Sequence, residues 1–270
     1  MKTARVDLFY NAYANFTDEV FAEIRAETYG RDIGQNSWVT VDEYEHFIDS
    51  LNLRFGARVL EVASGSGGPT LHLARRRECT VVGIDVNPEA VRTATRAAVS
   101  TALSSRVTFR RADASEPLPF PDDSFDALLC IDSMNHFPDR GYSLGEWRRV
   151  LKPGGRAVFT DPVVITGAVT NEELAQRSSI GLFVFLPRGL NEELIVKAGF
   201  RIVSQTDATE NAALVSRRWR EARQRFRDDL LRIEGEERFE GVQKFLGAVH
   251  QLSDERRLSR IAWVVEKPAN

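Results

Sequence analysis

The 270-residue sequence contains only two cysteines, Cys79 and Cys130. Two cysteines do not supply the disulfide framework of a small secreted scaffold, and their spacing is not that of a zinc site. Both lie inside runs that predict buried strands, where cysteine acts as a small apolar side chain. The sequence therefore predicts no metal site, and a reducing cytoplasm is the expected compartment.

Long apolar runs and an excess of basic charge are also missing. No run approaches the roughly 20 apolar residues that span a bilayer, and the first seven residues lack the apolar core of a secretion signal. The formal net charge is −3, whereas proteins that bind nucleic acid or anionic membranes usually carry a basic excess. We therefore expect neither nucleic acid nor a membrane as a partner.

Residues 58–85 are the most informative stretch. A strand-forming run over residues 59–62 leads into the small residues Ala-Ser-Gly-Ser-Gly and then into a helical run. A second strand-forming run ends at Asp85, twenty residues after Gly65. This is the order of a nucleotide-binding βαβ unit, in which glycines let the backbone approach the ligand and the acid accepts hydrogen bonds from ribose hydroxyls.

Strands and helices continue to alternate along the chain. Asn87, followed by proline, predicts a helix start, and residues 40–43 and 143–146 have the spacing of capping boxes. The alternation predicts an α/β fold with a doubly wound, mostly parallel, Rossmann-like sheet. Seven strands are expected, over residues 58–63, 79–85, 106–110, 126–131, 156–160, 200–203 and 259–265.

The length and the hydrophobic content of 43% suit a single domain over residues 1–270. Residues 1–52 are expected to form an N-terminal helical cap, and residues 53–210 with 256–270 the core sheet. Residues 211–255 carry two apolar stripes at helical spacing, and so few residues make a poor independent core. We therefore expect a helical lid inserted between the last two strands. A further helix is expected over residues 171–182.

Five short motifs, in order and in register over roughly residues 55–165, resemble the class I S-adenosylmethionine-dependent methyltransferases. They are residues 59–67, Asp85, Arg-Ala-Asp-Ala at 111–114, Phe-Asp-Ala-Leu-Leu at 125–129 and Leu-Lys-Pro-Gly-Gly at 151–155. The flanking segments are similar to small-molecule enzymes, such as sarcosine/dimethylglycine N-methyltransferases and natural-product tailoring enzymes. The resemblance implies S-adenosylmethionine as cofactor and a small-molecule acceptor that is methylated at oxygen or nitrogen.

The resemblance also assigns the cofactor-binding residues. It places the methionine carboxylate at the backbone of Gly65 and Gly67, the amino end near Glu61, the ribose at Asp85 and the adenine at Asp113. The whole expected set is Glu61, Ala63, Ser64, Gly65, Gly67, Asp85, Val86, Asp113, Ala114 and Cys130. Ala63 stands where the family has its first glycine, so we expect a negative φ there.

The acceptor is expected beside the segment that leaves the fourth strand. His136 is a candidate general base, because an unperturbed imidazole titrates near neutral pH; the competing interpretation is that it only packs the loop. Aromatic residues before the core could stack on the acceptor or close over the sulfonium cation, or simply pack the N-terminal region. The expected acceptor-binding residues are Tyr10, Tyr13, Trp38, Asp132 and Asn135.

Two other functions compete with this interpretation. An NAD-dependent oxidoreductase would have a third glycine where Thr70 stands, and a non-catalytic cofactor-binding regulator would keep the same motifs. The six arginines within residues 217–227 alternate with acids and predict a solvated helix face. The sequence identifies neither the acceptor nor the assembly state, for which a homodimer is one candidate.

Overall fold

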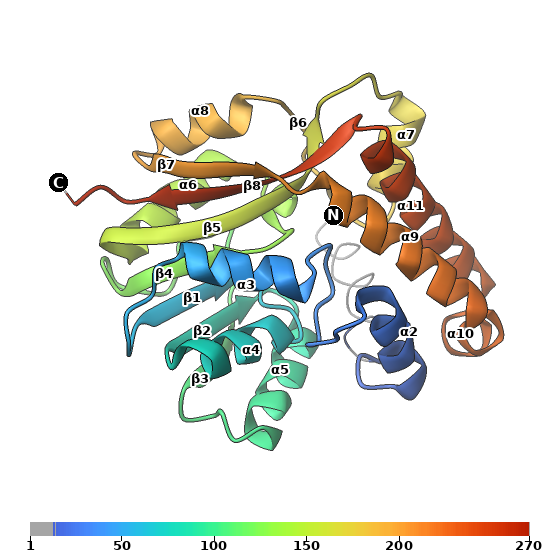
Figure 1. Cartoon of the computed structure of the whole chain (residues 1–270), viewed down its shortest axis with the longest axis horizontal. Coiled ribbons are helices and arrows are strands. Elements are labelled where there is room, and N and C mark those ends of the chain that lie inside the picture. The colour runs from blue at the N-terminus through green and yellow to red at the C-terminus, as the bar shows by residue number, and fades with distance from the viewer. Residues whose placement is uncertain (1–12, 14, 270) are drawn as a thin grey trace.

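The computed structural model describes residue 13 and residues 15–269. In this part of the chain eight strands form one sheet in the order β3-β2-β1-β4-β5-β8-β7, with β6 paired to β5 (Figure 1). Strands β1 to β5 are parallel, and β8 is antiparallel to β5 and β7. The bounds are β1 Arg58–Val62, β2 Thr80–Asp85, β3 Val107–Arg111, β4 Phe125–Cys130, β5 Leu151–Ile165, β6 Leu186–Pro187, β7 Arg201–Asp207 and β8 Leu258–Glu266. The predicted mostly parallel sheet is confirmed, and the two-residue β6 is a strand that the sequence did not predict.

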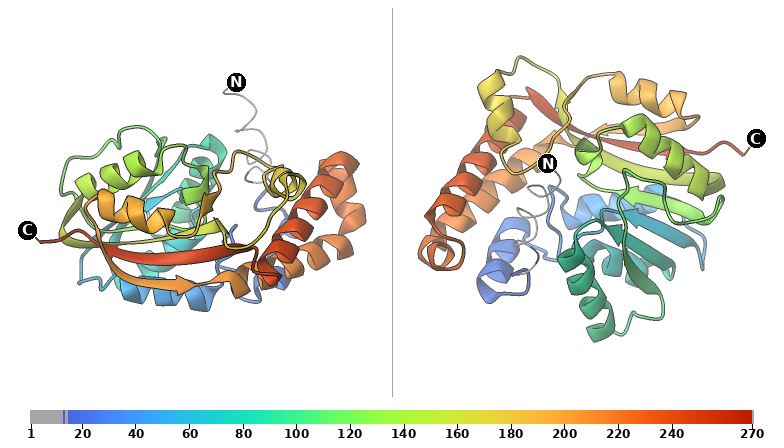
Figure 2. Two further views of the ribbon diagram at one scale, coloured as in Figure 1. Left: turned by 90° about the horizontal axis from the view of Figure 1, so that it is seen from above. Right: turned by 180° about the vertical axis from the view of Figure 1, so that it is seen from behind.

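Helices cover both faces of the sheet (Figure 2). Helices α3, α4 and α5 contribute to the core on one face, and α6 and α8 to the core on the other. The bounds are α2 Glu19–Tyr29, α3 Val41–Ser50, α4 Gly68–Arg77, α5 Pro88–Ser100, η1 Met134–His136, α6 Arg140–Val150, α7 Asn171–Arg177, α8 Leu190–Lys197, α9 Thr209–Arg225, α10 Arg227–Glu234 and α11 Glu236–Asp254. Within the described residues, no helix combines the length and the apolar character needed to cross a membrane.

Strand β1 shows how the sequence divides these two cores. Leu60 and Val62 join the core under α6 and α8, whereas Val59 joins the core under α3 and α4. Side chains alternate along a strand, so Glu61 points to the same face as Val59. Each fully buried aliphatic side chain contributes about 1.5–3 kcal/mol. Glu61, which is 4% exposed, is thus a carboxylic acid inside an apolar layer.

The late helices α9, α10 and α11 lie beside α2 at one end of the sheet (Figure 1). Their apolar stripes are covered by the N-terminal segments, because Val215 and Phe245 share a cluster with Trp38, while Leu230 and Phe239 pack with Ile24 of α2. The helices span residues 209–254. Whether this segment acts as a lid stays a prediction.

The predicted capping box at residues 143–146 is wrong. Helix α6 begins at Arg140, and the carboxylate of Asp139 caps it by accepting the Tyr142 backbone N–H at 2.9 Å. Ser143 is buried inside the first turn, where its hydroxyl donates to the Asp139 carbonyl at 3.2 Å. Aspartate is as favourable an N-cap as serine, and because Asp139 makes the capping bond here, the helix starts earlier.

The capping box at residues 40–43 is only half formed. The Thr40 hydroxyl accepts the Glu43 backbone N–H at 3.3 Å, as expected. The Glu43 carboxylate, however, turns away to bind Arg260. A buried cation is a stronger partner than the free N–H at the helix start.

The predicted helix over residues 171–182 ends at Arg177. The chain beyond it turns back toward η1, where the Val184 N–H donates to the Asn135 carbonyl at 2.8 Å. Long-range hydrogen bonds thus override the local helical tendency, and they do so beside the expected acceptor site.

Candidate functional site

The loop between β1 and α4 has the backbone that the small residues predict, with one correction. Gly65 and Gly67 have φ values of 54° and 80°. Ala63 has a φ of 57°, so the expectation of a negative φ there is wrong. A left-handed alanine costs about 1–2 kcal/mol. The hydrogen bond from Ser64 N–H to the Ile84 carbonyl at 2.9 Å holds this conformation against β2.

The two glycines are needed for different neighbours. A Cβ at Gly67 would lie 2.5 Å from the Phe109 ring and 2.7 Å from Ala94, so packing against β3 and α5 excludes it. A Cβ at Gly65 would lie 2.9 Å from the Tyr13 hydroxyl. The structure therefore places Tyr13 against the glycine loop. Burial raises the pKa of the Tyr13 phenol, which stays protonated.

Asp85 ends β2 and fixes the glycine loop. One carboxylate oxygen accepts the Gly65 N–H and the other accepts the Asn87 N–H, both at 2.8 Å. Burial raises the pKa of Asp85, and these N–H donors oppose the rise. A carboxylate has about four acceptor positions, and the backbone N–H groups do not use all of them, so Asp85 can also accept from ribose hydroxyls beside the loop.

Glu61 has the chemistry to bind a cationic group. Burial raises the pKa of Glu61 to about 7, while the Thr70 and Tyr44 hydroxyls oppose the rise. Its Oε2 is buried and has no hydrogen-bond partner among the described residues. An unsatisfied buried oxygen is costly, and the ammonium group of an amino-acid moiety would satisfy it. The residues around the loop thus fit the predicted cofactor.

The remaining expected cofactor residues line the same edge of the sheet. Strands β3, β2, β1 and β4 are neighbours and end together, where open α/β sheets bind ligands. Asp113 is exposed and its carboxylate accepts the Ser115 N–H at 2.9 Å. Val86 is 48% exposed, whereas Ala114 and Cys130 are buried in the core. Cys130 therefore offers only its backbone to a ligand.

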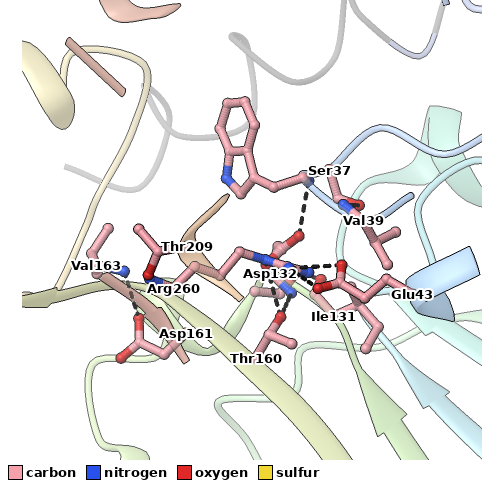
Figure 3. A network of polar contacts seen from close by, with 12 residues as sticks. Ser37, Val39, Glu43, Ile131, Asp132, Thr160, Asp161, Val163, Thr209 and Arg260 are labelled. Carbon is pink, nitrogen blue, oxygen red and sulfur yellow. Dashed lines mark hydrogen bonds and ion pairs between the residues drawn. The ribbon is translucent and has the colours of Figure 1, made fainter. Parts of the chain in front are cut away.

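Asp132 is an anchor within the protein (Figure 3). Its carboxylate accepts hydrogen bonds from Arg260 Nε at 2.6 Å, the Thr160 hydroxyl at 2.7 Å and the Trp38 N–H at 2.9 Å. Its side chain is only 3% exposed and its φ is 53°. The structure therefore places Asp132 beside the expected acceptor region, with its oxygens directed inward.

Arg260 and Glu43 complete this network, and neither was expected at the site. Arg260 is fully buried in β8, and its Nη1 lies 2.7 Å from both Glu43 oxygens. Burial raises the pKa of Glu43 and Arg260 opposes the rise. The available signal was an arginine inside the apolar run of residues 259–265, since a buried arginine needs acidic partners.

His136 lies in η1, just beyond β4, and is half-buried. Its Nδ1 lies 2.8 Å from the Leu182 carbonyl oxygen, and its ring centroid lies 4.8 Å from that of Phe183. The Asn135 amide nitrogen is 3.3 Å from Nε2. The side chain is therefore held in place by residues that follow α7.

Trp38 packs into an aromatic cluster instead of standing open. It is 7% exposed, and its ring centroid lies 6.0 Å from that of Trp219 and 6.2 Å from that of Phe245. Tyr10 lies outside the described residues. Among the residues that are described, no group of three or more His, Cys, Asp or Glu side chains is arranged to hold a metal ion.

Comparisons with known proteins agree with this geometry. The family described as "Methyltransferase domain" matches residues 60–159. The 27-O-demethylrifamycin SV methyltransferase of Amycolatopsis mediterranei is 29% identical over 96% of this chain and 95% of that protein. The O-methyltransferase rstn1 of Aspergillus nomiae is 30% identical over 59% of this chain and 71% of that protein. A putative sarcosine dimethylglycine methyltransferase from Galdieria sulphuraria has the same fold, with a TM-score of 0.83 at 18% identity over 96% of this chain and 98% of that one.

Proposed function

The chain belongs to the class I S-adenosylmethionine-dependent methyltransferases, and we propose that it methylates a hydroxyl oxygen of a small-molecule acceptor. Methyl transfer from S-adenosylmethionine to a small molecule is the activity of the family. The alternatives, an NAD-dependent oxidoreductase and a non-catalytic regulator, are not favoured by these relatives. The names of the two relatives support oxygen as the methylated atom.

The observation that carries the proposal is the contact between His136 Nδ1 and the Leu182 carbonyl at 2.8 Å. A carbonyl oxygen only accepts, so Nδ1 holds the proton and Nε2 of the neutral ring is the basic nitrogen. A hydroxyl nucleophile gains from such a base, whereas a neutral amine needs none. His136 would take the hydroxyl proton at Nε2, where the acceptor hydroxyl would replace the Asn135 amide N–H that lies 3.3 Å from this nitrogen.

The cofactor supplies an electrophilic methyl group when it is bound. Glu61 would receive its ammonium group, the backbone of Gly65 and Gly67 its carboxylate, and Asp85 its ribose hydroxyls. Asp85 is already oriented by two backbone N–H groups. Such pre-set donors and acceptors favour binding in one geometry, which is the main contribution that a methyltransferase makes to the rate.

Aromatic side chains beside His136 would keep water from the acceptor. Phe183 contacts the His136 ring, and Phe245 of α11 lies next to Phe183, with ring centroids 6.3 Å apart. We propose on this basis that α9 to α11 are a lid over the acceptor. Slower hydrogen exchange in these helices on binding S-adenosylhomocysteine would support this role; unchanged exchange would contradict it.

A labelled methyl group tests the choice of oxygen. The enzyme would be given deuteromethyl-labelled S-adenosylmethionine with matched phenols and anilines, and the products analysed by mass spectrometry. We expect labelled methyl ethers from the phenols. Labelled methylamines without any ether would contradict O-methylation and still be consistent with the family.

We also propose that the enzyme acts in the cytoplasm as a homodimer, without nucleic acid or membrane as partner. The two buried free thiols are compatible with a reducing compartment. Light scattering tests the assembly, and a mass of one chain at micromolar concentration would contradict a homodimer. Fractionation of the producing cells tests the compartment, and recovery outside the cytoplasm would contradict it.

A further inference from the structure

Arg177, the last residue of α7, is a buried arginine that forms no ion pair with an acid in the part of the chain that the structure describes. It is 1% exposed, and its Nη1 and Nη2 have no hydrogen-bond partner among the described residues. The guanidinium group carries five N–H donors and no acceptor. Leaving buried donors unsatisfied is unfavourable, and a charged group makes the cost larger.

Three aromatic rings surround this guanidinium. Its central carbon lies 4.9 Å from the Phe183 centroid, 5.2 Å from that of Phe245 and 5.9 Å from that of Trp38. The rings come from the segment after α7, from α11 and from the N-terminal region; α7 and α11 lie side by side (Figure 1). Rings stabilise a cation through their faces but accept no strong hydrogen bond. The three rings of Phe183, Phe245 and Trp38, called the aromatic cage below, therefore stabilise the positive charge but do not satisfy the N–H groups of Nη1 and Nη2.

The other buried arginines show what ordinary pairing looks like in this protein. Arg140 binds Asp161 and also donates to the Asn191 side-chain oxygen at 2.8 Å. Arg260 binds Asp132 and Glu43. Arg223, in α9, lies 5.6 Å from the Phe239 ring and also has an acid, Glu234. Arg177 has the aromatic neighbours of Arg223 without the acid.

The charge of Arg177 persists at neutral pH. Burial lowers the pKa of Arg177 to about 10, and Asp161 and Asp132 oppose the fall from a distance. The guanidinium is therefore a cation that interacts electrostatically with Asp132. It forms no hydrogen bond with Asp132, Glu43 or Thr160.

The position of the cage ties it to the acceptor. Phe183 contacts both Arg177 and the His136 ring, so the guanidinium and the proposed base lie against the same aromatic side chain. Trp38 borders the cage as well, and its N–H binds Asp132. A flat molecule whose hydroxyl reaches His136 would bring a second substituent toward Arg177.

We propose that Arg177 binds an anionic oxygen of the acceptor, a carboxylate or an ionised phenol. This inference rests on the proposed function and names the acceptor class: a flat, acidic molecule. A guanidinium binds a carboxylate through two parallel N–H bonds, and the single oxygen of an ionised phenol also accepts its N–H groups. Phe183, Phe245 and Trp38, which surround the guanidinium, would flank the ring that bears the anionic group.

Direct binding tests the proposal without any turnover. Calorimetry on the enzyme saturated with S-adenosylhomocysteine would compare benzoate with methyl benzoate, 2-naphthoate with its methyl ester, and ionised 4-nitrophenol with 4-nitroanisole. The first two pairs report a carboxylate site and the third a phenolate site. We expect at least one anion to bind better than its neutral partner. We expect Arg177→Met to weaken that anion about 10- to 100-fold and to leave the neutral partner unchanged.

A matched variant separates recognition from stability. Arg223→Met removes a buried arginine that lies beside an aromatic ring and is paired with an acid. It should therefore lower the melting temperature and leave the preference for anions unchanged. Arg177→Met should keep or raise the melting temperature, because it removes an unpartnered buried charge. Arg177→Lys keeps the charge but not the paired N–H geometry and should restore only part of the preference.

Two results would overturn the proposal. One is that the wild-type enzyme binds no anion better than its neutral partner in any pair. The other is that Arg177→Met lowers the melting temperature and retains the anion preference, which would make Arg177 a structural cation. The labelled-methyl experiment could yield only methylamines while the preference for anions still depends on Arg177. That outcome would contradict O-methylation and support the anion site.

Discussion

The two halves of the site are built in different ways. The cofactor half consists of backbone turns at the ends of β1 and β2, where Asp85 and Gly65 are twenty residues apart and directly hydrogen-bonded. The proposed acceptor half consists of side chains from distant segments, such as Trp38, Arg177 and Phe245, which contact one another. Short motifs specify the first half, whereas only the tertiary fold assembles the second.

The charges of the two halves differ as well. The cofactor half buries two acids, Glu61 and Asp85, whose pKa values burial raises. The proposed acceptor half buries cations: Arg260 is paired with acids, whereas the Arg177 Nη atoms have no hydrogen-bond partner among the described residues. Glu61 and Arg177 are thus buried ionisable groups, each proposed to bind a group of opposite charge.

The largest expected effect comes from Arg260. Arg260→Met would leave Asp132 and Glu43 buried without their cation, which costs about 3–5 kcal/mol of unfolding free energy. Urea unfolding would measure the loss. Arg256→Met is the matched control, because Arg256 is half-exposed and its pair with Asp207 contributes about 0–1 kcal/mol.

A compensated variant sharpens this test. Adding Asp132→Asn and Glu43→Gln to Arg260→Met removes the uncompensated charges and should recover part of the loss. Asparagine also tolerates the positive φ at position 132. If Arg260→Met costs no more than Arg256→Met, the network does not hold the acceptor half together.

Glu61 should produce a pH-dependent effect of about 3 kcal/mol on stability. Its pKa is raised from 4.5 to about 7, so the folded cofactor-free enzyme keeps a proton that the unfolded chain loses. Wild-type stability should therefore fall as pH rises between these two pKa values, by about 1.4 kcal/mol for each pH unit. Glu61→Gln lacks this titration and should be the more stable form at about pH 8, although it binds S-adenosylhomocysteine less tightly.

Thermal unfolding across this pH range measures the Glu61 effect. Glu221→Gln, at an exposed position of α9, is the control and should follow the wild type throughout. Parallel stability curves for wild type and Glu61→Gln would show that the buried acid does not titrate as described.

Asp85 should give a smaller effect, on affinity. Asp85→Asn retains oxygen and size but loses the charge, so S-adenosylmethionine should bind about 1.5–2 kcal/mol more weakly by calorimetry. Asp85→Ala should weaken binding further, because it also releases the Gly65 N–H. Unchanged affinity in both variants would contradict the proposal that Asp85 binds the ribose hydroxyls.

The sequence predicted the cofactor half because its chemistry is local. Gly65, Gly67, Asp85 and Glu61 lie where strand ends and a tight turn put them, and the parallel sheet brings those ends to one edge. Local reasoning failed at Ala63, because a long-range hydrogen bond from Ser64 to Ile84 holds a φ that alanine avoids.

The acceptor half could not be predicted in the same way. Glu43 and Arg260 are 217 positions apart and meet only in the folded sheet. The helix over residues 171–182 ends five residues early, and this break frees Leu182 and Phe183 to contact His136. The sequence did not single out Arg177, because it contains many arginines and most of the surrounding pattern predicts exposed helix positions.

The pH dependence of His136 tests the central claim most directly. We would measure kcat/KM for a phenol acceptor across about pH 5 to 9, with the wild type and His136→Ala side by side. The wild-type rate should fall about tenfold per pH unit below the range where imidazoles titrate, near pH 6.5, and the variant should lose this acidic limb. If the same limb persists in His136→Ala, the titrating group lies elsewhere and His136 only packs the loop.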